Sequence, residues 1–406
     1  METKIKKNIL IIGGGFGGVK AAQILGRDRR CAVRLVDPKA YMEYHAATYR
    51  LTTGRSALEV CIPYTELLRG SGAEVVKDAV VSIDPAKKQA VGLSASTYDY
   101  DELILAIGCE SSYFGIQGVE EHAYSINSVD DALKLRRHIH DSFEKAKTTP
   151  PEEKVPLLHV AVIGGGASGT ELAGEFAAYT RSLAKAHGID PSLVTIDLIE
   201  AMTRVLPGLP EHLSAKAHQR LRELGVNVYL NRSVVREEVD KLFLKDMQMT
   251  TKTVVWTAGL KANGMTATIP GLSLDKRGRV LVDDHLRALG VSHVSVIGDV
   301  ASTKYSGMAQ TALADAAYVA KSIRTGSPVA YVQPAPAYAV PVGPGYAVVL
   351  YHGMSFSGSI GWFLRRAADF RAFLSMLGLA PSIRAFLAGM VRHESCPVCA
   401  KNSGSF

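Results

Sequence analysis

The sequence predicts an α/β protein with two Rossmann-like dinucleotide-binding domains, followed by a β-hairpin and amphipathic helices. Two glycine-rich turns, in residues 9–18 and 160–169, carry most of this prediction. Each turn follows a short apolar run typical of a buried parallel strand, and each leads into an alanine-rich helix, which is the context that a dinucleotide fingerprint requires. Two such turns in one chain indicate two dinucleotides in one molecule, an arrangement in which electrons usually pass between them.

The first turn has the spacing G-x-G-x-x-G at Gly13, Gly15 and Gly18. The first glycine allows a tight turn, the second lets the main chain approach a pyrophosphate, and the third packs the helix against the strand. The helix N-terminus then offers unpaired N–H groups and a partial positive charge to the phosphates. Strand 32–36 ends in Asp37, where a ribose-binding carboxylate belongs; the alternative is a turn residue ahead of a proline.

The second turn repeats the pattern at Gly164, Gly166 and Gly169. The next strand ends in Glu200, farther past the turn than the usual ~20 positions, because the intervening helix is long. A carboxylate there would bind ribose hydroxyls and repel a 2′-phosphate, which favours NADH over NADPH, although Arg204 nearby weakens that preference. For either turn, the alternative is a glycine-rich turn without a ligand.

The chain length is consistent with two or three domains. We expect residues 1–125 and 265–328 to form a discontinuous first domain, 126–264 a second, and 329–406 a C-terminal segment. Residues 98–108 are predicted to form one strand that ends in a small-residue turn, and 128–147 a charged helix. Residues 148–156 have the composition of a loop.

The net charge of +7 is modest, but residues 331–406 hold six Lys/Arg against two Asp/Glu. Because no nucleic-acid-binding motif is present, this basic segment favours an acidic membrane surface and no nucleic-acid partner. The five cysteines have no regular framework and no apolar signal segment precedes the first strand, which fits a reducing compartment. We expect a cytoplasmic protein, peripheral on the inner face of the cell membrane.

The uncharged stretch 335–364 is interrupted by prolines and glycines, and therefore favours a hairpin of 338–342 and 346–351 over a membrane span. A helix is predicted at 359–377, with Arg365 and Asp369 opposite an apolar stripe, and a second short helix after Pro381. These helices can lie in a membrane interface, or pack on their own protein or on the partner of a homodimer. The stripe consists of Phe363, Ala367, Phe370, Leu374 and Leu377.

Cys396 and Cys399 form a single C-x-x-C pair near the end of the chain. Two thiolates, even with His393 as a third ligand, do not complete a closed zinc site, which needs four ligands. We therefore expect no metal. A zinc ion shared across a dimer, a redox-active dithiol and an idle tail remain alternatives.

Several ordered motifs resemble the two-dinucleotide-binding, glutathione-reductase-like flavoproteins over about residues 7–325. They are most similar to type II NADH:quinone oxidoreductases, with the apoptosis-inducing-factor-like quinone reductases as near relatives. Besides the two glycine turns, the likeness rests on residues 106–108, 112–115, 171–174, 200–207, 255–259, 297–299 and 308–313.

The resemblance implies non-covalent FAD in the first domain and NADH on the second. It places Glu171 near the junction of nicotinamide and flavin, where it would tune nicotinamide placement or relay a proton; the alternative is a carboxylate on the helix surface. Glu171 and Gln310 are the candidate catalytic residues. The implied FAD-binding residues are Gly13, Gly15, Phe16, Gly18, Asp37, Ala106, Gly108, Asp299, Ala309 and Gln310. The implied NADH-binding residues are Gly164, Gly166, Gly169, Glu200 and Gly259.

The implied reaction is hydride transfer from NADH to flavin, then transfer of two electrons to a quinone, without proton pumping. One departure concerns Ala314, where the family often has a glutamine. In this chain the quinone is then held differently than in that family, or the electron acceptor is another molecule. The alternatives are a soluble reductase of a protein or disulfide acting through Cys396 and Cys399, and an NADH-sensing interaction protein. A sulfide:quinone oxidoreductase is a weaker fit, because Cys109 lacks a partner cysteine near the flavin.

Overall fold

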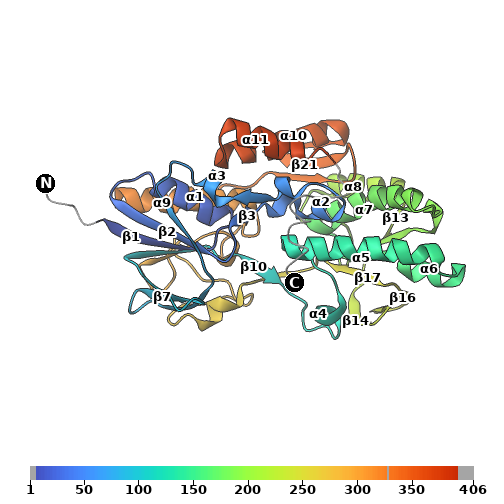
Figure 1. Ribbon diagram of the computed structural model, residues 1–406, viewed down its shortest axis with the longest axis horizontal. Coiled ribbons are helices and arrows are strands. Elements are labelled where there is room, and N and C mark those ends of the chain that lie inside the picture. The colour runs from blue at the N-terminus through green and yellow to red at the C-terminus, as the bar shows by residue number, and fades with distance from the viewer. Residues whose placement is uncertain (1–5, 327–328, 392–406) are drawn as a thin grey trace. The chain divides into compact units, whose positions relative to one another are not determined.

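The computed structural model of the chain describes residues 6–326 and 329–391 (Figure 1). It divides into two compact units. Unit 1 consists of Met1–Tyr44, Cys61–Glu110 and Leu260–Pro336, and unit 2 of His45–Val60, Ser111–Gly259 and Ala337–Phe406. Each unit is therefore assembled from three separate stretches of the chain.

Unit 1 is built on a five-stranded parallel sheet with the order β19-β9-β1-β2-β5. The central strand β1 pairs in parallel with β2 and β9, and its last four residues are buried. Strands buried on both faces favour such continuous apolar runs. The sheet strands are β1 (Lys7–Ile12), β2 (Cys31–Asp37), β5 (Glu74–Lys77), β9 (Glu102–Leu105) and β19 (Val294–Val296).

Two helices of unit 1, α1 (Phe16–Leu25) and α9 (Ala309–Thr325), lie side by side although they are far apart in sequence (Figure 1). Small sheets complete the unit. They are formed by β3 (Tyr41–Glu43) with β4 (Cys61–Pro63), by β6 (Val80–Asp84), β7 (Gln89–Gly92) and β8 (Thr97–Asp99), and by β10 (Cys109–Ser111) with β18 (Leu260–Ala262). The short helix α3 (Tyr64–Leu67) follows β4.

The prediction of one strand at residues 98–108 is wrong, because β8 and β9 are separate strands in different sheets. The break falls at Asp101, whose amide donates to the Asn8 carbonyl (2.9 Å) and whose carboxylate accepts from the Asn8 amide (2.7 Å). These two bonds fix the chain at the beginning of β1 and let it change direction between the sheets.

Unit 2 contains a four-stranded parallel sheet with the order β13-β12-β11-β17. Its strands are β11 (His159–Ile163), β12 (Thr195–Ile199), β13 (Val226–Tyr229) and β17 (Thr253–Trp256), and its main helices are α5 (Val129–Thr148), α7 (Ala167–Ala186) and α8 (Glu211–Glu223). Helix α5 begins at an N-cap, Ser128, whose side chain accepts from the Asp131 amide. A meander of β14 (Val234–Glu238), β15 (Lys241–Leu244) and β16 (Gln248–Thr250) and the short α4 (Val119–His122) extend the unit.

The predicted loop at residues 148–156 is also wrong, because helix α6 spans Pro151–Leu157. A proline in the first turn of a helix costs nothing, since its missing N–H would have had no intrahelical partner. Glu152 and Glu153 in the same turn interact favourably with the helix dipole. A prediction from composition alone gives a loop here, because it takes no account of where in a helix each proline would lie.

The C-terminal part of unit 2 begins with the predicted hairpin, now formed by β20 (Tyr338–Pro341) and β21 (Ala347–Tyr351). A third strand, β22 (Met354–Ser357), pairs with β21 and was not predicted. Helices α10 (Gly358–Met376) and α11 (Leu379–Ala388) follow, coloured red in Figure 1. In the described part of the chain, no helix is both long and apolar enough to cross a membrane.

One apolar core joins segments of unit 2 that are distant in the sequence. Tyr49 of α2 (Thr48–Thr52) is 2% exposed and packs in the same cluster as Phe143 of α5 and Phe176 of α7. Val340 of β20 and Val348 of β21 belong to it as well. The segment His45–Val60 and the C-terminal sheet are therefore integral parts of the unit that holds the second glycine turn.

Candidate functional site

The two glycine turns have nearly the same backbone geometry. The first glycine has φ +100° at Gly13 and φ +108° at Gly164, a region that favours glycine. The helix N-caps also agree, with φ −75° and ψ −168° at Gly15 and φ −69° and ψ −171° at Gly166. Each unit therefore contains one copy of the same turn between a buried strand and a helix.

The third glycine of each turn permits close packing. A Cβ on Gly18 would lie 1.8 Å from the Gly13 carbonyl oxygen, and a Cβ on Gly169 would lie 1.8 Å from the Gly164 carbonyl oxygen. No other residue type fits at either position without displacing the main chain of the turn.

The second glycine, by contrast, borders open space. A Cβ on Gly15 or Gly166 would meet nothing within 4 Å. Neither α1 nor α7 has a side-chain N-cap or an acidic residue in its first turn, so the protein supplies no anion to the first N–H groups of these helices. A pyrophosphate fits this arrangement, because it brings negative charge and acceptor oxygens to the helix N-terminus.

A carboxylate stands beside each turn. Asp37 Oδ2 accepts from the Gly14 amide (2.7 Å), and Glu200 Oε2 accepts from the Gly165 amide (2.6 Å). Burial raises the pKa of Asp37, while hydrogen bonds from the Lys39 and Gly14 amides partly offset the rise. One main-chain N–H of each turn thus holds the carboxylate at the edge of that turn.

Arg204 does not offset the charge of Glu200. Its guanidinium donates to the carbonyls of Leu209 (2.8 Å) and Pro207 (2.8 Å). Two of its five N–H donors are therefore engaged by main-chain oxygens next to the turn.

In unit 1, Asp299 lies in a short 3₁₀ turn (Gly298–Val300) directly after β19. Its Oδ1 accepts from the Gly307 amide (3.0 Å) and its Oδ2 from the Cys109 thiol (3.3 Å). Burial, together with the adjacent Asp299 carboxylate, raises the pKa of Cys109, so this thiol stays protonated as a donor. The sequence places Cys109 near the predicted flavin turn, but no pattern in it predicts the contact with Asp299.

The other predicted FAD-binding residues of unit 1 lie at the ends of its strands and helices. Ala106 follows β9, and its amide donates to the Ile12 carbonyl of β1 (2.9 Å). Phe16 begins α1 and contacts the Tyr44 ring edge-on, with the ring centroids 5.3 Å apart. Gly108 has φ +69°, and Ala309 and Gln310 are the first two residues of α9.

In unit 2, Gly259 ends the segment that returns from the sheet. It has φ +85°, and a Cβ there would lie 2.3 Å from the Phe114 ring. The Ser112 amide donates to the Gly259 carbonyl (3.2 Å), and the Trp256 indole donates to the Ser112 carbonyl (2.9 Å). Residues 112–115 thus pack against Gly259, which the resemblance assigns to NADH binding.

Glu171, in the second turn of α7, is 8% exposed. The alternative of a helix-surface carboxylate is therefore wrong. Burial raises the pKa of Glu171 to about 7, although Arg365 and Arg50 lower it in part. The nearest cationic group is Arg365 Nη1, 3.4 Å from Glu171 Oε1. A carboxyl that titrates near neutral pH is suited to proton transfer.

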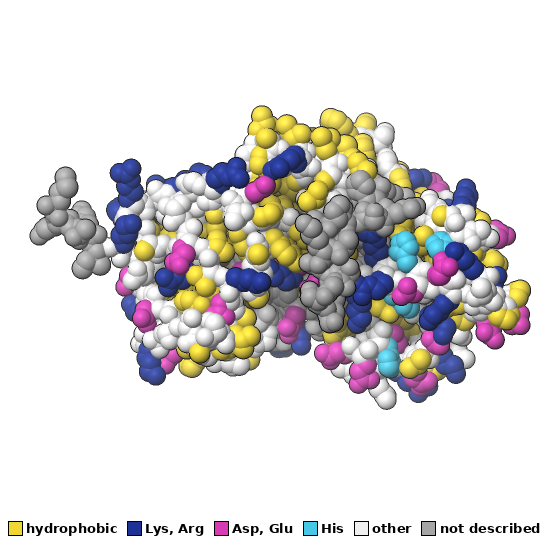
Figure 2. Space-filling view, viewed as in Figure 1, with side chains coloured by type: hydrophobic (Ala, Val, Ile, Leu, Met, Phe, Trp, Pro, Cys, Tyr) yellow, Lys and Arg dark blue, Asp and Glu magenta, His cyan; other side chains and the backbone are white. Residues whose placement is uncertain are grey.

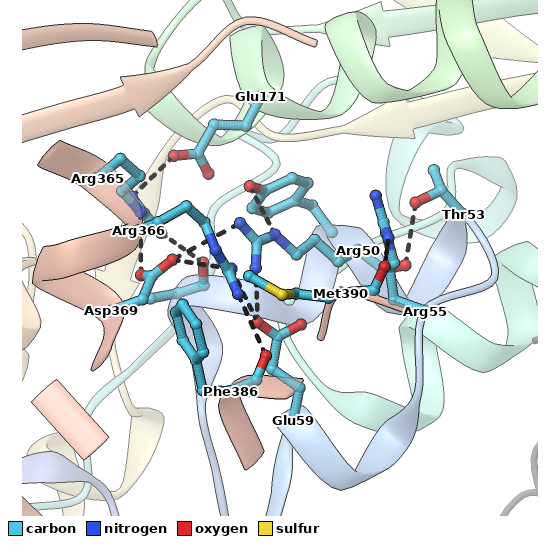
Figure 3. Close-up of polar contacts among 12 residues, drawn as sticks. Arg50, Thr53, Arg55, Glu59, Glu171, Arg365, Arg366, Asp369, Phe386 and Met390 are labelled. Carbon is cyan, nitrogen blue, oxygen red and sulfur yellow. Dashed lines mark hydrogen bonds and ion pairs between the residues drawn. The ribbon is translucent and has the colours of Figure 1, made fainter. Parts of the chain in front are cut away.

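Glu171 borders a buried cluster of ion pairs (Figure 3). Arg50 lies 2.5 Å from Glu59 and 3.6 Å from Asp369, and Arg366 lies 3.5 Å from Glu59 and 3.3 Å from Asp369. Asp369 was predicted only as part of the polar side of an amphipathic helix. Arg365 and Arg366 of the same helix pair with it, but no sequence pattern predicts its third partner, Arg50, which lies about three hundred residues earlier.

No group of three or more metal-ligating side chains occurs within residues 6–326 and 329–391. Cys396, Cys399 and His393 lie outside the described residues.

Comparisons with known proteins give the family. Residues 7–317 match the family described as pyridine nucleotide-disulphide oxidoreductase. The chain is 34% identical over 337 residues to type II NADH:quinone oxidoreductase Ndh of Mycobacterium tuberculosis, covering 79% of this chain and 72% of the relative. It is 26% identical over 398 residues to type II NADH:quinone oxidoreductase of Staphylococcus haemolyticus, covering 92% and 97%.

Solved structures agree on the fold. NDH2 from Plasmodium falciparum in complex with NADH aligns with a TM-score of 0.84 at 19% identity, covering 94% of this chain and 97% of that one. Sulfide:quinone oxidoreductase from Aquifex aeolicus aligns with a TM-score of 0.76 at 18% identity, covering 95% and 92%. With two matching dinucleotide turns and this similarity over most of its length, the chain belongs to the pyridine nucleotide-disulphide oxidoreductase family and, within it, to the type II NADH:quinone oxidoreductases.

Proposed function

We propose that this protein oxidises NADH through FAD and reduces a quinone, without pumping protons. The observation that carries the proposal is the pair of matching glycine turns, each with a carboxylate beside it and uncapped N–H groups in front of it. The relatives named type II NADH:quinone oxidoreductase support the same reaction.

In this proposal the unit 1 turn holds FAD and the unit 2 turn holds NADH. FAD bound there would supply the redox chemistry, which is hydride acceptance from NADH and delivery of two electrons to a quinone. The protein binds and orients. Asp37 and Glu200 receive the ribose hydroxyls, the helix N-termini receive the phosphates, and Asp299 holds the ribityl chain.

Glu171 is the residue that we propose for proton transfer. Reduction of a quinone to a quinol consumes two protons, and a carboxyl whose pKa is about 7 can both give and accept a proton at neutral pH. Gln310, at the start of α9, is proposed to contact the flavin ring or the quinone.

The steady-state test is NADH oxidation by FAD-loaded protein, with and without a water-soluble quinone. Quinone-dependent oxidation is expected, with a preference for NADH over NADPH. If the flavin is reduced by NADH but no quinone reoxidises it faster than oxygen does, the proposed function is wrong.

We further propose that α10 and α11 rest on the membrane surface from which the quinone is drawn. Figure 2 shows hydrophobic side chains gathered over these two helices. Phe363 is 68% exposed and Leu387 52% exposed, and the same surface includes Ile360, Trp362, Leu374, Leu379, Ile383 and Met390. Exposed apolar patches of this kind mark membrane or protein interaction sites.

The charge around this surface favours an anionic membrane over a second copy of the chain. Between residues 358 and 391 the one acidic residue is Asp369, which is buried, whereas Arg371 and Arg384 are exposed. Basic side chains beside an apolar helix face attract anionic lipid headgroups. In the cell this surface would be the inner face of the cell membrane.

The membrane proposal is tested by flotation with vesicles of phosphatidylglycerol and phosphatidylcholine. Phe363→Glu with Leu387→Glu should abolish flotation, because two charges enter the apolar interface. Val239→Glu is the matched control, since Val239 is 71% exposed but belongs to the β14–β15 turn. Flotation by the double variant would contradict the proposal. If the double variant instead changes only the oligomeric state, measured by sedimentation, the surface is a dimer interface.

A further inference from the structure

Helix α10 buries two charged side chains and exposes several large apolar ones. Arg366 and Asp369 are 6% and 4% exposed, whereas Ile360 and Phe363 on the other side are 63% and 68% exposed. Burying a charge is costly unless it is paired and hydrogen-bonded. The inward side of α10 must therefore be held by partners of opposite charge, and Figure 3 shows them.

The cluster joins three guanidinium groups, which do not lose their proton in proteins, to three buried carboxyl groups. Its members are Arg50, Arg365 and Arg366, and Glu59, Glu171 and Asp369.

Arg365 is the group that Glu171 and Asp369 share. Its Nε lies 3.0 Å from Asp369 Oδ1 and its Nη1 3.4 Å from Glu171 Oε1. Two carbonyls also hold the guanidinium, that of Ala339 (2.7 Å, to Nη1) and that of Ala46 (3.1 Å, to Nη2). The contact with Asp369 is the shorter of the two, so the cation lies closer to Asp369 than to Glu171.

The carboxylates of Glu171 and Asp369 have unequal numbers of ion-pair partners. Asp369 also has Arg366 at 3.3 Å and Arg50 at 3.6 Å, whereas Arg365 is the one ion-pair partner of Glu171 among the residues that the structure describes. The one ion pair of Glu171 (3.4 Å) is longer than the shortest pair of Glu59 (2.5 Å) or of Asp369 (3.0 Å), so Glu171 is the carboxyl that keeps a proton most readily. The other groups that act on it electrostatically are Arg50, Asp369, Glu175 and Tyr49.

We propose that Asp369 is a positioning residue for Glu171, because it holds the Arg365 guanidinium on its own side and so leaves the Glu171 carboxyl able to exchange a proton with the quinone. This inference rests on the proposed function of Glu171. Through Asp369, helix α10 then sets the proton affinity of Glu171 in α7. The same helix carries the exposed apolar surface.

The test is Asp369→Asn, which removes the competing charge and keeps the shape of the side chain. Among the described residues Glu171 is then the one carboxylate paired with Arg365, and an opposite charge at this range lowers a carboxyl pKa by about 1 to 3. We expect the proton affinity of Glu171 to fall about tenfold or more. The direct readout is the infrared carboxyl stretch that disappears in Glu171→Gln, followed against pH. The neutral limb of the pH profile for quinone reduction should move to lower pH by the same amount.

The matched control is Glu59→Gln, which removes the same charge from the same buried cluster. Glu59 contacts Arg50 and Arg366, and no described contact joins it to Arg365. Its variant should lose stability much as Asp369→Asn does, but should move the Glu171 titration clearly less. Asp369→Glu, which keeps the charge, should return the titration towards that of the parent. Equal shifts in the Glu59 and Asp369 variants would overturn the proposal.

A charge-balanced double variant covers the case in which Asp369→Asn does not fold. Arg366→Gln with Asp369→Asn removes a cation together with the anion and still releases Arg365 from its competitor. The Glu171 stretch should titrate at lower pH here too, and an unchanged titration would overturn the proposal.

The two proposals fail in different ways. The proposed function fails when the parent protein shows no quinone-dependent oxidation of NADH. The inference about Asp369 fails when the infrared titration is the same in parent and variant, whatever the turnover.

Discussion

His159 Nε2 lies 2.8 Å from Asp197 Oδ2, and this buried pair joins neighbouring strands of the unit 2 sheet. The other ring nitrogen of His159 lies 3.0 Å from the Thr250 carbonyl, and Asn227 donates to the second oxygen of Asp197 (2.9 Å). Because both ring nitrogens face acceptors, the doubly protonated imidazolium satisfies both contacts. The pair therefore depends on a proton that is lost at high pH.

The first prediction concerns the stability that this pair provides. Burial lowers the pKa of His159, but the hydrogen bond and charge of Asp197 more than offset this and raise it above 6.5. The stabilisation is therefore fully present below the unfolded pKa of about 6.5 and is lost as pH rises through the higher folded value. His159→Gln should cost about 1.5–3 kcal/mol at pH 5.5 and clearly less at pH 9, measured by urea unfolding.

His218→Gln is the control, because this histidine is only partly buried on α8 and both burial and Arg222 lower its pKa. It should show no loss of stability that is confined to low pH. If His159→Gln costs the same at pH 5.5 and pH 9, the imidazolium pair does not stabilise the fold.

The second prediction concerns Glu237, a buried carboxyl in β14. It is 6% exposed, and its Oε2 has no hydrogen-bond partner among residues 6–326 and 329–391. Burial raises its pKa to about 8. The unfolded chain releases this proton near pH 4.5 and the folded chain near pH 8, so the stability that the protonated group provides is lost as pH rises through about 8.

Glu237→Gln should therefore stabilise the protein at pH 9, by about 1–3 kcal/mol, and have little effect at pH 4. Glu238→Gln is the neighbouring control, since its side chain is about half exposed and pairs with Arg236 on the surface. Thermal unfolding at both pH values measures the difference. A loss of stability in Glu237→Gln at pH 9 would contradict the prediction.

The glycine turns could be predicted from the sequence because they specify their own geometry. The three glycines of each turn, the strand before it and the acid after the next strand lie within one stretch of chain, and each has a local steric or electrostatic reason. The matching backbone angles of Gly13 and Gly164 follow from that local code.

The ion cluster could not be predicted in this way. The period of α10 correctly separates an apolar side from a side with Arg365 and Asp369, but a period does not tell which side faces the protein. That choice depends on Arg50 of α2 and on Glu59, which ends the 3₁₀ helix Ala57–Glu59, both about three hundred residues earlier. Pairing across such a distance leaves no pattern in a single sequence.

The third prediction concerns Cys109, whose thiol donates to Asp299 in unit 1. If Asp299 holds the ribityl chain of FAD, this bond fixes the carboxylate in place. Cys109→Ser keeps a donor, whereas Cys109→Val keeps the approximate size and removes it. We expect the serine variant to retain FAD and the valine variant to bind it about tenfold more weakly, equal to ~1.4 kcal/mol.

Fluorescence of FAD released on dilution measures this difference directly. Cys31→Val is the control, because this half-buried thiol lies at the beginning of β2, at the other end of that strand from Asp37. Equal FAD affinity in Cys109→Val and the parent protein would show that the thiol does not support Asp299.

The last prediction separates packing from ligand binding within one turn. Gly169→Ala places a Cβ 1.8 Å from the Gly164 carbonyl oxygen and 2.6 Å from Thr257 Oγ1, so it should destabilise the fold by about 1–3 kcal/mol. Gly166→Ala places a Cβ in open space at an N-cap with φ −69°, where alanine costs the fold about 1 kcal/mol or less.

The same Cβ at residue 166 stands where a diphosphate would approach the main chain. Gly166→Ala should therefore bind NADH roughly tenfold more weakly, ~1.4 kcal/mol, at nearly unchanged thermal stability. Titration calorimetry and thermal unfolding on the two variants measure both effects. The opposite pattern, in which Gly166→Ala binds NADH normally, would mean that the nucleotide does not lie against this turn, because a ligand held by main-chain amides cannot avoid an added methyl group at their centre.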